Sequence, residues 1–395
     1  MAETISLSNE WKRPPYSWLT FMLFWCALIV VSGAYVTTPL LHVFESEFQV
    51  SKTMSAWTSS SFSFFYAIGF LLFGPLSDRI GRKTVILIGL LSLAITTPLI
   101  GLSTSFSVLV ILRGLQGFVA STFAPSALAY VFDVFPSNRL ITTIGFISFG
   151  YVTSGIFGQV LADLLYQWAS WKTVFFLFGF LYFMTFIAAS IYFPTPAKSG
   201  EKEGIRYYVI NSKKIFSERN FILIYFITIT LLLTFMGMYT LLGDFFSHEP
   251  FQLNEKQILG VRALGIVGMI ISPFAGKIVN KLGVLVTLRT GIGLSALGLF
   301  LLGGGNHILF LVGMSIVYVM GISITFPSIM VLIGELGGNI RALVNTYYAF
   351  ILFIGAMLGP IIAISLLSIG TYFTTFLILS LLLVGSFLLS LKIKI

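Results

Sequence analysis

Charged side chains are scarce in this sequence. Of its 395 residues only 9% are Asp, Glu, Lys or Arg, whereas 57% are hydrophobic. A soluble domain usually carries about 25% charged residues, so this chain lacks the charge to cover itself with a hydrated surface. The composition therefore excludes an ordinary soluble protein and indicates a chain that lies mostly in lipid.

Cysteine and nucleotide-binding patterns are also lacking. Cys26 is the single cysteine, which excludes a disulfide within the chain and a cysteine cluster around a metal. His42, His248 and His307 are widely separated and suggest no metal site. The phosphate-binding pattern Gly-x-x-x-x-Gly-Lys-Ser/Thr is missing, as is any recognisable group of nucleophile, base and acid. We expect no enzyme, no cofactor and no direct use of ATP.

Long apolar runs, by contrast, are abundant. A membrane helix needs about 20 mostly apolar residues, and the sequence predicts an all-α polytopic membrane protein with twelve transmembrane helices. The predicted spans lie near residues 19–41, 55–76, 84–103, 107–132, 140–162, 173–193, 220–243, 257–276, 284–303, 307–333, 342–368 and 371–391.

A polar segment near residues 194–219 divides these spans into two sets of six. The sequence thus predicts an N-terminal six-helix bundle over residues 1–193, a cytoplasmic linker over 194–219 and a C-terminal six-helix bundle over 220–395. An internal repeat supports this division. Residues 74–81 (GPLSDRIG) are echoed 202 positions later by residues 276–283 (GKIVNKLG). The repeat indicates that the halves arose by duplication.

Basic residues fix the expected orientation. If the N-terminus is cytoplasmic, the external loops hold only Lys52, Lys172 and Lys256, and most other Lys and Arg residues face the cytoplasm. Cytoplasmic loops of membrane proteins carry such an excess. Both termini are therefore predicted to be cytoplasmic, and the formal charge of +9 reflects topology rather than binding of nucleic acid.

The most specific motif lies in the predicted loop between helices 2 and 3. It reads GPLSDRIGRK, with defined positions at Gly74, Leu76, Asp78, Arg79, Gly81, Arg82 and Lys83. It resembles the loop signature of the major facilitator superfamily, Gly-x-Leu-x-Asp-Arg-x-Gly-Arg-Lys, at every defined position. The resemblance implies alternating access between two bundles and a conformational latch on the cytoplasmic side. Asp133, at the inner end of predicted helix 4, is the expected partner of Arg82.

Two further segments resemble proton-coupled exporters of that superfamily. Arg113, followed by Gln116, matches a helix 4 signature whose arginine is associated with proton coupling. Predicted helix 5 carries an antiporter-like motif that lacks the family proline. Its residues are Gly150, Ser154, Gly155, Gly158 and Gln159. The resemblance implies proton antiport driven by the proton gradient, although small residues four apart also suit any tight pair of membrane helices.

Few charges lie within the predicted helices. Arg113 and Arg262 lie inside helices, whereas the nearest carboxylates, Asp163 and Asp244, lie at outer helix ends. Charges at bilayer depth are costly and usually functional, so we expect Arg113 to pair with Asp163, and Arg262 with Asp244. Two arginines without a central acid suit an anionic solute. The polar residues expected around a cavity are Thr37, Thr38, Tyr66, Gln116, Tyr151, Tyr239, Asn345 and Tyr348.

These observations favour a secondary-active, proton-antiport exporter of small organic molecules in the bacterial cytoplasmic membrane. We expect a monomer surrounded by membrane lipids, an anionic or amphiphilic substrate, and no nucleic-acid partner. Three alternatives stay open. They are a dedicated exporter of an anionic metabolite or siderophore-like metallophore, a proton-coupled importer of a sugar or organic acid, and a membrane sensor or lipid-handling protein.

Overall fold

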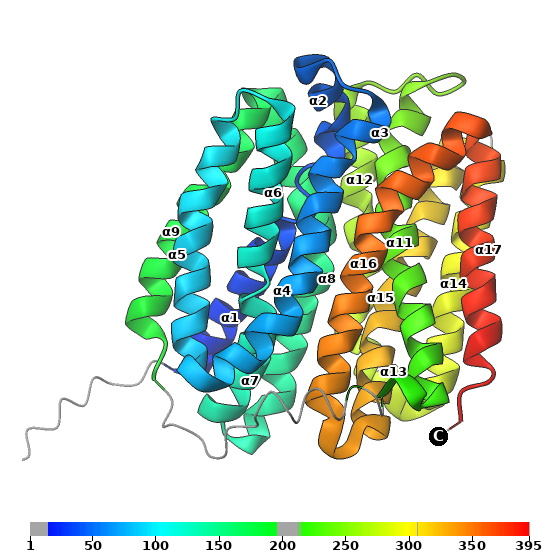
Figure 1. The fold of residues 1–395 in the computed structure, drawn as a ribbon. Coiled ribbons are helices and arrows are strands. Elements are labelled where there is room, and N and C mark those ends of the chain that lie inside the picture. Colours follow the sequence, from blue (N-terminus) through cyan, green and yellow to red (C-terminus); the bar gives the residue numbers. More distant parts are fainter. Residues whose placement is uncertain (1–14, 196–211, 213–214, 306, 395) are drawn as a thin grey trace, which may run out of the picture.

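The computed structural model describes residues 15–195, 212, 215–305 and 307–394. Within these residues the chain forms helices joined by short turns, with no β-strand among them. The helices stand in two bundles side by side (Figure 1). The N-terminal bundle contains α1 (Tyr16–Ser32), the 3-10 turn η1 (Thr38–Leu40), α2 (Leu41–Phe48), α3 (Lys52–Ser55), α4 (Trp57–Ile80), α5 (Arg82–Gly101), α6 (Phe106–Ala120), α7 (Phe123–Val134), α8 (Ser137–Trp168) and α9 (Trp171–Tyr192).

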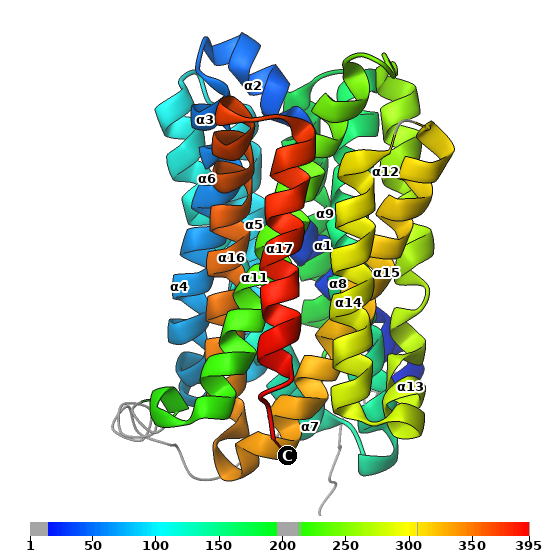
Figure 2. The same cartoon turned by 90° about the vertical axis from the view of Figure 1, so that its right-hand side faces the viewer.

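The C-terminal bundle follows the predicted linker 194–219, most of which lies outside the described residues. This bundle contains α11 (Arg219–Ser247), α12 (Glu255–Met269), η2 (Ser272–Phe274), α13 (Ala275–Leu282), α14 (Val284–Gly304), α15 (Ile308–Gly337), η3 (Gly338–Ile340), α16 (Arg341–Ile369) and α17 (Tyr372–Ser390). We call the end of the molecule that carries α2 and α3 the α2 face. The opposite end, where the chain finishes, is the C-terminal face (Figures 1 and 2).

Ten helical segments in the described part of the chain are long and apolar enough to cross a membrane. Their backbone groups are hydrogen bonded within each segment, as an environment without water requires. The other two predicted spans, 19–41 and 257–276, are interrupted helices. One passes from α1 through η1 into α2, and the other from α12 through η2 into α13. Pro39 and Pro273 lie in these turns, and proline lacks the N–H group that continues a helix.

Two equivalent glycines make sharp turns at the C-terminal face. Gly81 ends α4 with a φ of 103°, and Gly283 ends α13 with a φ of 85°. Side chains with a Cβ rarely adopt this left-handed backbone. The two glycines occupy matching positions in the predicted repeat, so the halves share a turn geometry as well as a sequence pattern.

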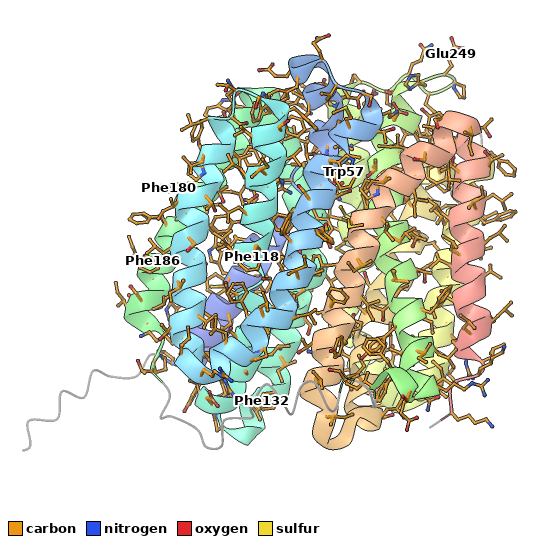
Figure 3. The ribbon with its side chains drawn as sticks, viewed as in Figure 1. Trp57, Phe118, Phe132, Phe180, Phe186 and Glu249 are labelled. Carbon is orange, nitrogen blue, oxygen red and sulfur yellow. The ribbon has the colours of Figure 1, made fainter. Side chains whose placement is uncertain are left out.

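The outer surface of both bundles is apolar. Ile95, Ile111 and Phe180 of the N-terminal bundle, and Leu297 and Leu381 of the C-terminal bundle, are each more than half exposed. Figure 3 shows Phe180 pointing away from the bundle. A soluble monomer rarely exposes apolar side chains over so much of its surface, so these faces suit contact with lipid. Between the bundles, α4 packs against α16 and α8 against α12.

Candidate functional site: a cavity between the bundles

A cavity of about 130 Å³ lies between the two bundles. It is walled by α1, α4, α7 and α8 on one side and by α11, α12, α15 and α16 on the other. The residues from α8 and α16 belong to the first halves of those helices, which begin at the C-terminal face (Figure 1). The cavity is therefore nearer the C-terminal face than the α2 face. Its wall residues Tyr35 and Met269 lie at the interruptions that follow α1 and α12.

Aromatic rings from both bundles meet in the cavity wall. The rings of Tyr66 on α4 and Phe353 on α16 have centroids 4.1 Å apart. Tyr35 and Phe235 meet edge to face, with centroids 6.0 Å apart and an interplanar angle of 86°. All four rings line the cavity. Among the wall residues that the structure describes, none carries a charge.

Three polar atoms in this wall have no hydrogen-bond partner. They are the hydroxyl of Tyr151 on α8, the hydroxyl of Ser323 on α15 and the carboxamide oxygen of Asn345 on α16. Buried polar atoms are usually hydrogen bonded, and an exception calls for an explanation. These atoms come from both bundles and lie in a largely apolar wall, which also carries the hydroxyl side chains Tyr35, Tyr66, Ser148 and Tyr348.

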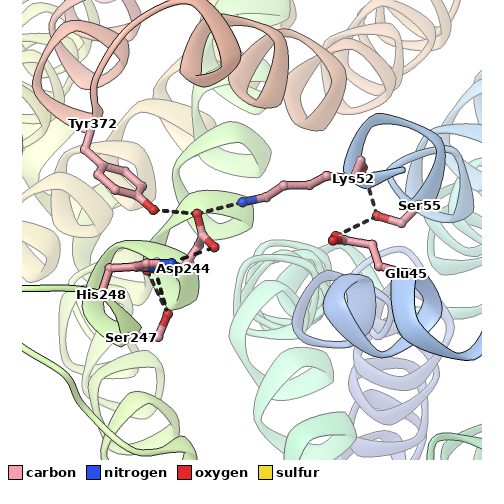
Figure 4. Close-up of polar contacts among 7 residues, drawn as sticks. All are labelled: Glu45, Lys52, Ser55, Asp244, Ser247, His248 and Tyr372. Carbon is pink, nitrogen blue, oxygen red and sulfur yellow. Dashed lines mark hydrogen bonds and ion pairs between the residues drawn. The ribbon is translucent and has the colours of Figure 1, made fainter. Parts of the chain in front are cut away.

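The two bundles are tied together at the α2 face. Lys52 at the start of α3 donates to an oxygen of Asp244 on α11 at 2.7 Å, and the Tyr372 hydroxyl donates to the same oxygen at 2.5 Å (Figure 4). Beside this network, Ser55 donates to Glu45 at 3.3 Å and holds α3 against α2. The Lys52–Asp244 pair is partly exposed, with side-chain exposures of 36% and 24%.

A second ion pair crosses between the bundles at greater depth. Arg262 on α12 donates to Asp163 on α8 at 3.1 Å, and the two side chains are only 6% and 9% exposed. Both ion pairs line a polar pocket of about 540 Å³ at the α2 face. The predicted pairings of Arg113 with Asp163 and of Arg262 with Asp244 are therefore wrong. Hydropathy does not fix the rotation of a helix about its axis. In the structure this rotation places Asp163 beside Arg262, and Asp244 pairs with Lys52 instead.

Arg113 lies inside the N-terminal bundle and is 0% exposed. Its Nε donates to the carbonyl oxygen of Thr58 at 2.9 Å, and a terminal nitrogen donates to the side-chain oxygen of Gln116. Gln116 in turn donates to Thr97 at 2.9 Å. The guanidinium also lies 4.6 Å from the centre of the Phe62 ring. These contacts join the three helices α4, α5 and α6 of one bundle, and Arg113 does not line the cavity.

The predicted latch is built around Arg82. One of its terminal nitrogens lies 2.5 Å from Asp133, which confirms the expected partner, and donates to a carbonyl oxygen of α7 at 2.6 Å. Lys83 donates to the carbonyl oxygen of Phe193 at 2.5 Å. These contacts tie the α4–α5 turn to α7 and α9, all within the N-terminal bundle. The remaining motif residues lie along the same segment. Gly74 faces α16, Arg79 is exposed and Gly81 makes the turn between α4 and α5. The side chain of Asp78 lies outside the described part.

The antiporter-like motif of α8 packs tightly against α1. A Cβ at Gly150 or at Gly158 would lie 2.8 or 2.7 Å from a carbonyl oxygen of α1, and one at Gly155 would lie 3.1 Å from the ring of Phe235. The side chains of Ser154 and Gln159 donate to carbonyl oxygens of α8 itself. The geometry accounts for the small residues as contacts between helices, and a role in antiport stays a prediction.

Comparison with known proteins decides the family. The family model described as Major Facilitator Superfamily matches residues 23–360. This chain belongs to the major facilitator superfamily. Relatives include an uncharacterized transporter of Buchnera aphidicola subsp. Schizaphis graminum, 28% identical over 68% of this chain and 65% of its own length. Another is the chloramphenicol resistance protein CraA of Acinetobacter baumannii, 30% identical over 56% of this chain and 52% of its own length.

Superfamily membership also agrees with the three-dimensional comparison. A bacterial homologue of the human lysosomal transporter Spinster, solved in an inward-facing and occupied conformation, matches with a TM-score of 0.75. It is 13% identical, and the match covers 96% of this chain and 97% of that one, so it supports the fold alone. The chain is accordingly a superfamily transporter and a multi-pass protein of the bacterial cytoplasmic membrane.

The sequence predicted some of the residues that line the cavity between the bundles. Four of the expected polar residues line the cavity: Tyr66, Tyr151, Asn345 and Tyr348. The others lie elsewhere: Thr37 and Gln116 contact Arg113, Thr38 lines the α2-face pocket, and Tyr239 lies against Gly265. Ser323, Lys52 and Tyr372 were missed. Lys52 had one usable signal, because it is among the few basic residues of the predicted external loops.

Proposed function

We propose that this protein exports small organic molecules from the bacterial cytoplasm by alternating access, driven by proton antiport and without a cofactor. Residues 1–193 and 220–395 would form the two moving units, joined by the cytoplasmic segment 194–219. A single chain brings all eight cavity-lining helices together, so a lipid-embedded monomer suffices.

The proposed topology has twelve crossings and two cytoplasmic ends. The interrupted helices from α1 to α2 and from α12 to α13 would supply the two crossings beyond the ten long apolar segments. Non-helical backbone is tolerated at membrane depth where it lines a cavity. Tyr35 lies in such an interruption, and Met269 ends α12 directly before the other. The C-terminal face would be cytoplasmic because it carries Arg79, Arg82 and Lys83, and cytoplasmic segments of membrane proteins carry an excess of basic residues.

One observation carries the proposal. Two ion pairs join the bundles at the α2 face, while the cavity between the bundles lies nearer the C-terminal face. This arrangement suits a conformation that is closed to the outside and loads its cargo from the cytoplasm. The names of relatives support export as the direction, since CraA confers chloramphenicol resistance.

Asp163 is the coupling residue that we propose. It joins Arg262 across the bundle interface, so opening the α2 face would separate the two and expose the carboxylate to external water. A carboxylate whose neighbours change between two conformations can bind a proton in one and release it in the other. The coupling role of Arg113 implied by the sequence stays a prediction, and its contacts described above include no carboxylate.

The test uses proteoliposomes with a proton gradient, an internal pH-sensitive dye and chloramphenicol as the probe. Addition of chloramphenicol should release protons through the wild-type protein, and Asp163→Asn should abolish this release. Glu249→Gln is the control, because Glu249 is an exposed carboxylate at the same face (Figure 3). Chloramphenicol transport without proton movement, or proton release that persists in Asp163→Asn, would contradict the proposed coupling.

A further inference from the structure

The central cavity has the chemistry of a selective binding site. Its largely apolar wall contains three buried polar atoms without partners, on Tyr151, Ser323 and Asn345. We propose that the cavity selects an uncharged, planar aromatic compound that carries a hydrogen-bonding group and is held from both bundles at once. This inference rests on the proposed function, because it names the cargo of the same cavity.

The absence of charge around the cavity excludes ions as preferred cargo. An ion leaving water needs a counter-ion or several hydrogen bonds to replace its hydration. None of the described wall residues is charged. The two arginines that are buried in the described part of the chain have other partners: Arg113 bonds within the N-terminal bundle, and Arg262 pairs with Asp163. The anionic solute expected from the sequence would therefore meet no cation in this cavity.

The rings of the wall favour a flat cargo. Tyr66 and Phe353 on one side, and Tyr35 and Phe235 on another, present aromatic surface from both bundles. Aromatic groups associate by offset stacking and edge-to-face contact. A planar ring can therefore fill the cavity with contacts that a flexible alkyl chain of similar volume would not make.

The unpartnered atoms fix where the polar group of the cargo lies. The Tyr151 and Ser323 hydroxyls can donate or accept a hydrogen bond, whereas the Asn345 carboxamide oxygen accepts one. Tyr151 belongs to the N-terminal bundle, and Ser323 and Asn345 belong to the C-terminal bundle. A cargo bearing a hydroxyl or an N–H group can thus bridge the bundles through hydrogen bonds that no protein group supplies.

A matched series of fluorescent coumarins tests this selection. The four compounds share one ring system and carry a hydroxymethyl, methyl, carboxylate or trimethylammonium substituent. Equilibrium binding is measured on the full chain in lipid nanodiscs, with no gradient. The hydroxymethyl compound should bind about tenfold more tightly than the methyl compound, as expected for one hydrogen bond. The carboxylate and trimethylammonium compounds should bind at least about a hundredfold more weakly than the hydroxymethyl compound.

Variants assign the contacts to particular atoms. Tyr151→Phe and Asn345→Leu should each weaken binding of the hydroxymethyl compound about tenfold and leave the methyl compound unchanged. Thr153→Val is the matched control: Thr153 lies on the same helix as Tyr151 and its hydroxyl is also unpartnered, but it does not line the cavity. Asn345→Asp should raise binding of the trimethylammonium compound at least tenfold, a gain that misfolding does not produce.

Three outcomes would overturn the inference. They are equal binding of the charged and uncharged compounds, a uniform loss of all binding in Tyr151→Phe and Asn345→Leu, and no binding of any compound to the wild-type protein. Failure of the proposed function looks different. In that case the hydroxymethyl compound binds as expected, but a proton gradient does not move it across proteoliposome membranes.

Discussion

Removing the carboxylate of Asp163 should open the α2 face. Arg262 would lose the one ion-pair partner that the described residues give it across the bundle interface, while its side chain stays 6% exposed. Breaking a buried ion pair from one side costs about 3–5 kcal/mol, because the remaining charge is unpaired. The loss raises the free energy of the conformation in which the bundles touch at the α2 face. The open conformation is not destabilised, because opening the face hydrates Arg262. Taking about 3 kcal/mol, Asp163→Asn should shift the equilibrium toward the open α2 face roughly a hundredfold.

Cysteine alkylation measures this shift. Cys26→Ser removes the buried native cysteine, and Thr240→Cys places a thiol in the α2-face pocket, where Thr240 is 7% exposed. A membrane-impermeant maleimide should label this thiol much faster when Asp163→Asn is added. A thiol introduced instead by Glu249→Cys, at an exposed position, should label at the same rate in both backgrounds.

A double variant distinguishes two effects: the burial of an unpaired charge on Arg262 and the loss of the ion pair itself. Replacing both partners of a buried ion pair by neutral groups is often close to neutral in free energy. Asp163→Asn combined with Arg262→Gln should therefore return labelling to within about tenfold of the parent. If Asp163→Asn alone leaves the labelling rate unchanged, the ion pair does not hold the bundles together and this reasoning is refuted.

Three further predictions concern other contacts. Lys52→Ala should speed labelling of the α2-face thiol only about twofold, because an exposed ion pair contributes on the order of 0.5 kcal/mol, and added salt should reproduce the effect in the parent protein. Arg113→Leu should lower the free energy of unfolding in detergent by about 2–4 kcal/mol, since it leaves buried partners unbonded; unchanged thermal stability would count against this. Gly158→Ala should destabilise the chain by about 1–3 kcal/mol through overpacking against α1, whereas Gly145→Ala on the same helix, with nothing within 4 Å of the added Cβ, should be neutral.

The sequence predicted features that depend on composition and local pattern. Apolar runs located all of the membrane helices described above, and the loop signature led to the correct family and to the Arg82–Asp133 contact. That contact was predictable because both residues lie near helix ends at one face, which leaves few alternative partners. The proline-containing turns of η1 and η2 were not anticipated, because hydropathy averages over such breaks.

Contacts that depend on helix rotation were not predictable. Asp163 and Arg262 are 99 positions apart, and neither residue carries a local signal for the other. A membrane helix is apolar on most sides, so the sequence pattern does not say which side faces the partner bundle. The same uncertainty explains why Thr37 and Gln116 were expected in the cavity but lie beside Arg113.

The uncharged cavity wall has a consequence for the energy source. If the protein exchanges a neutral cargo for one proton, as we propose, each cycle moves one net positive charge inward. The membrane voltage then drives transport together with the pH difference, and one elementary charge gains about 2.3 kcal/mol per 100 mV. A transporter that exchanged a monovalent cation for one proton would gain nothing from voltage. With the pH equal on both sides, a potassium-diffusion potential alone should therefore be enough to concentrate the cargo.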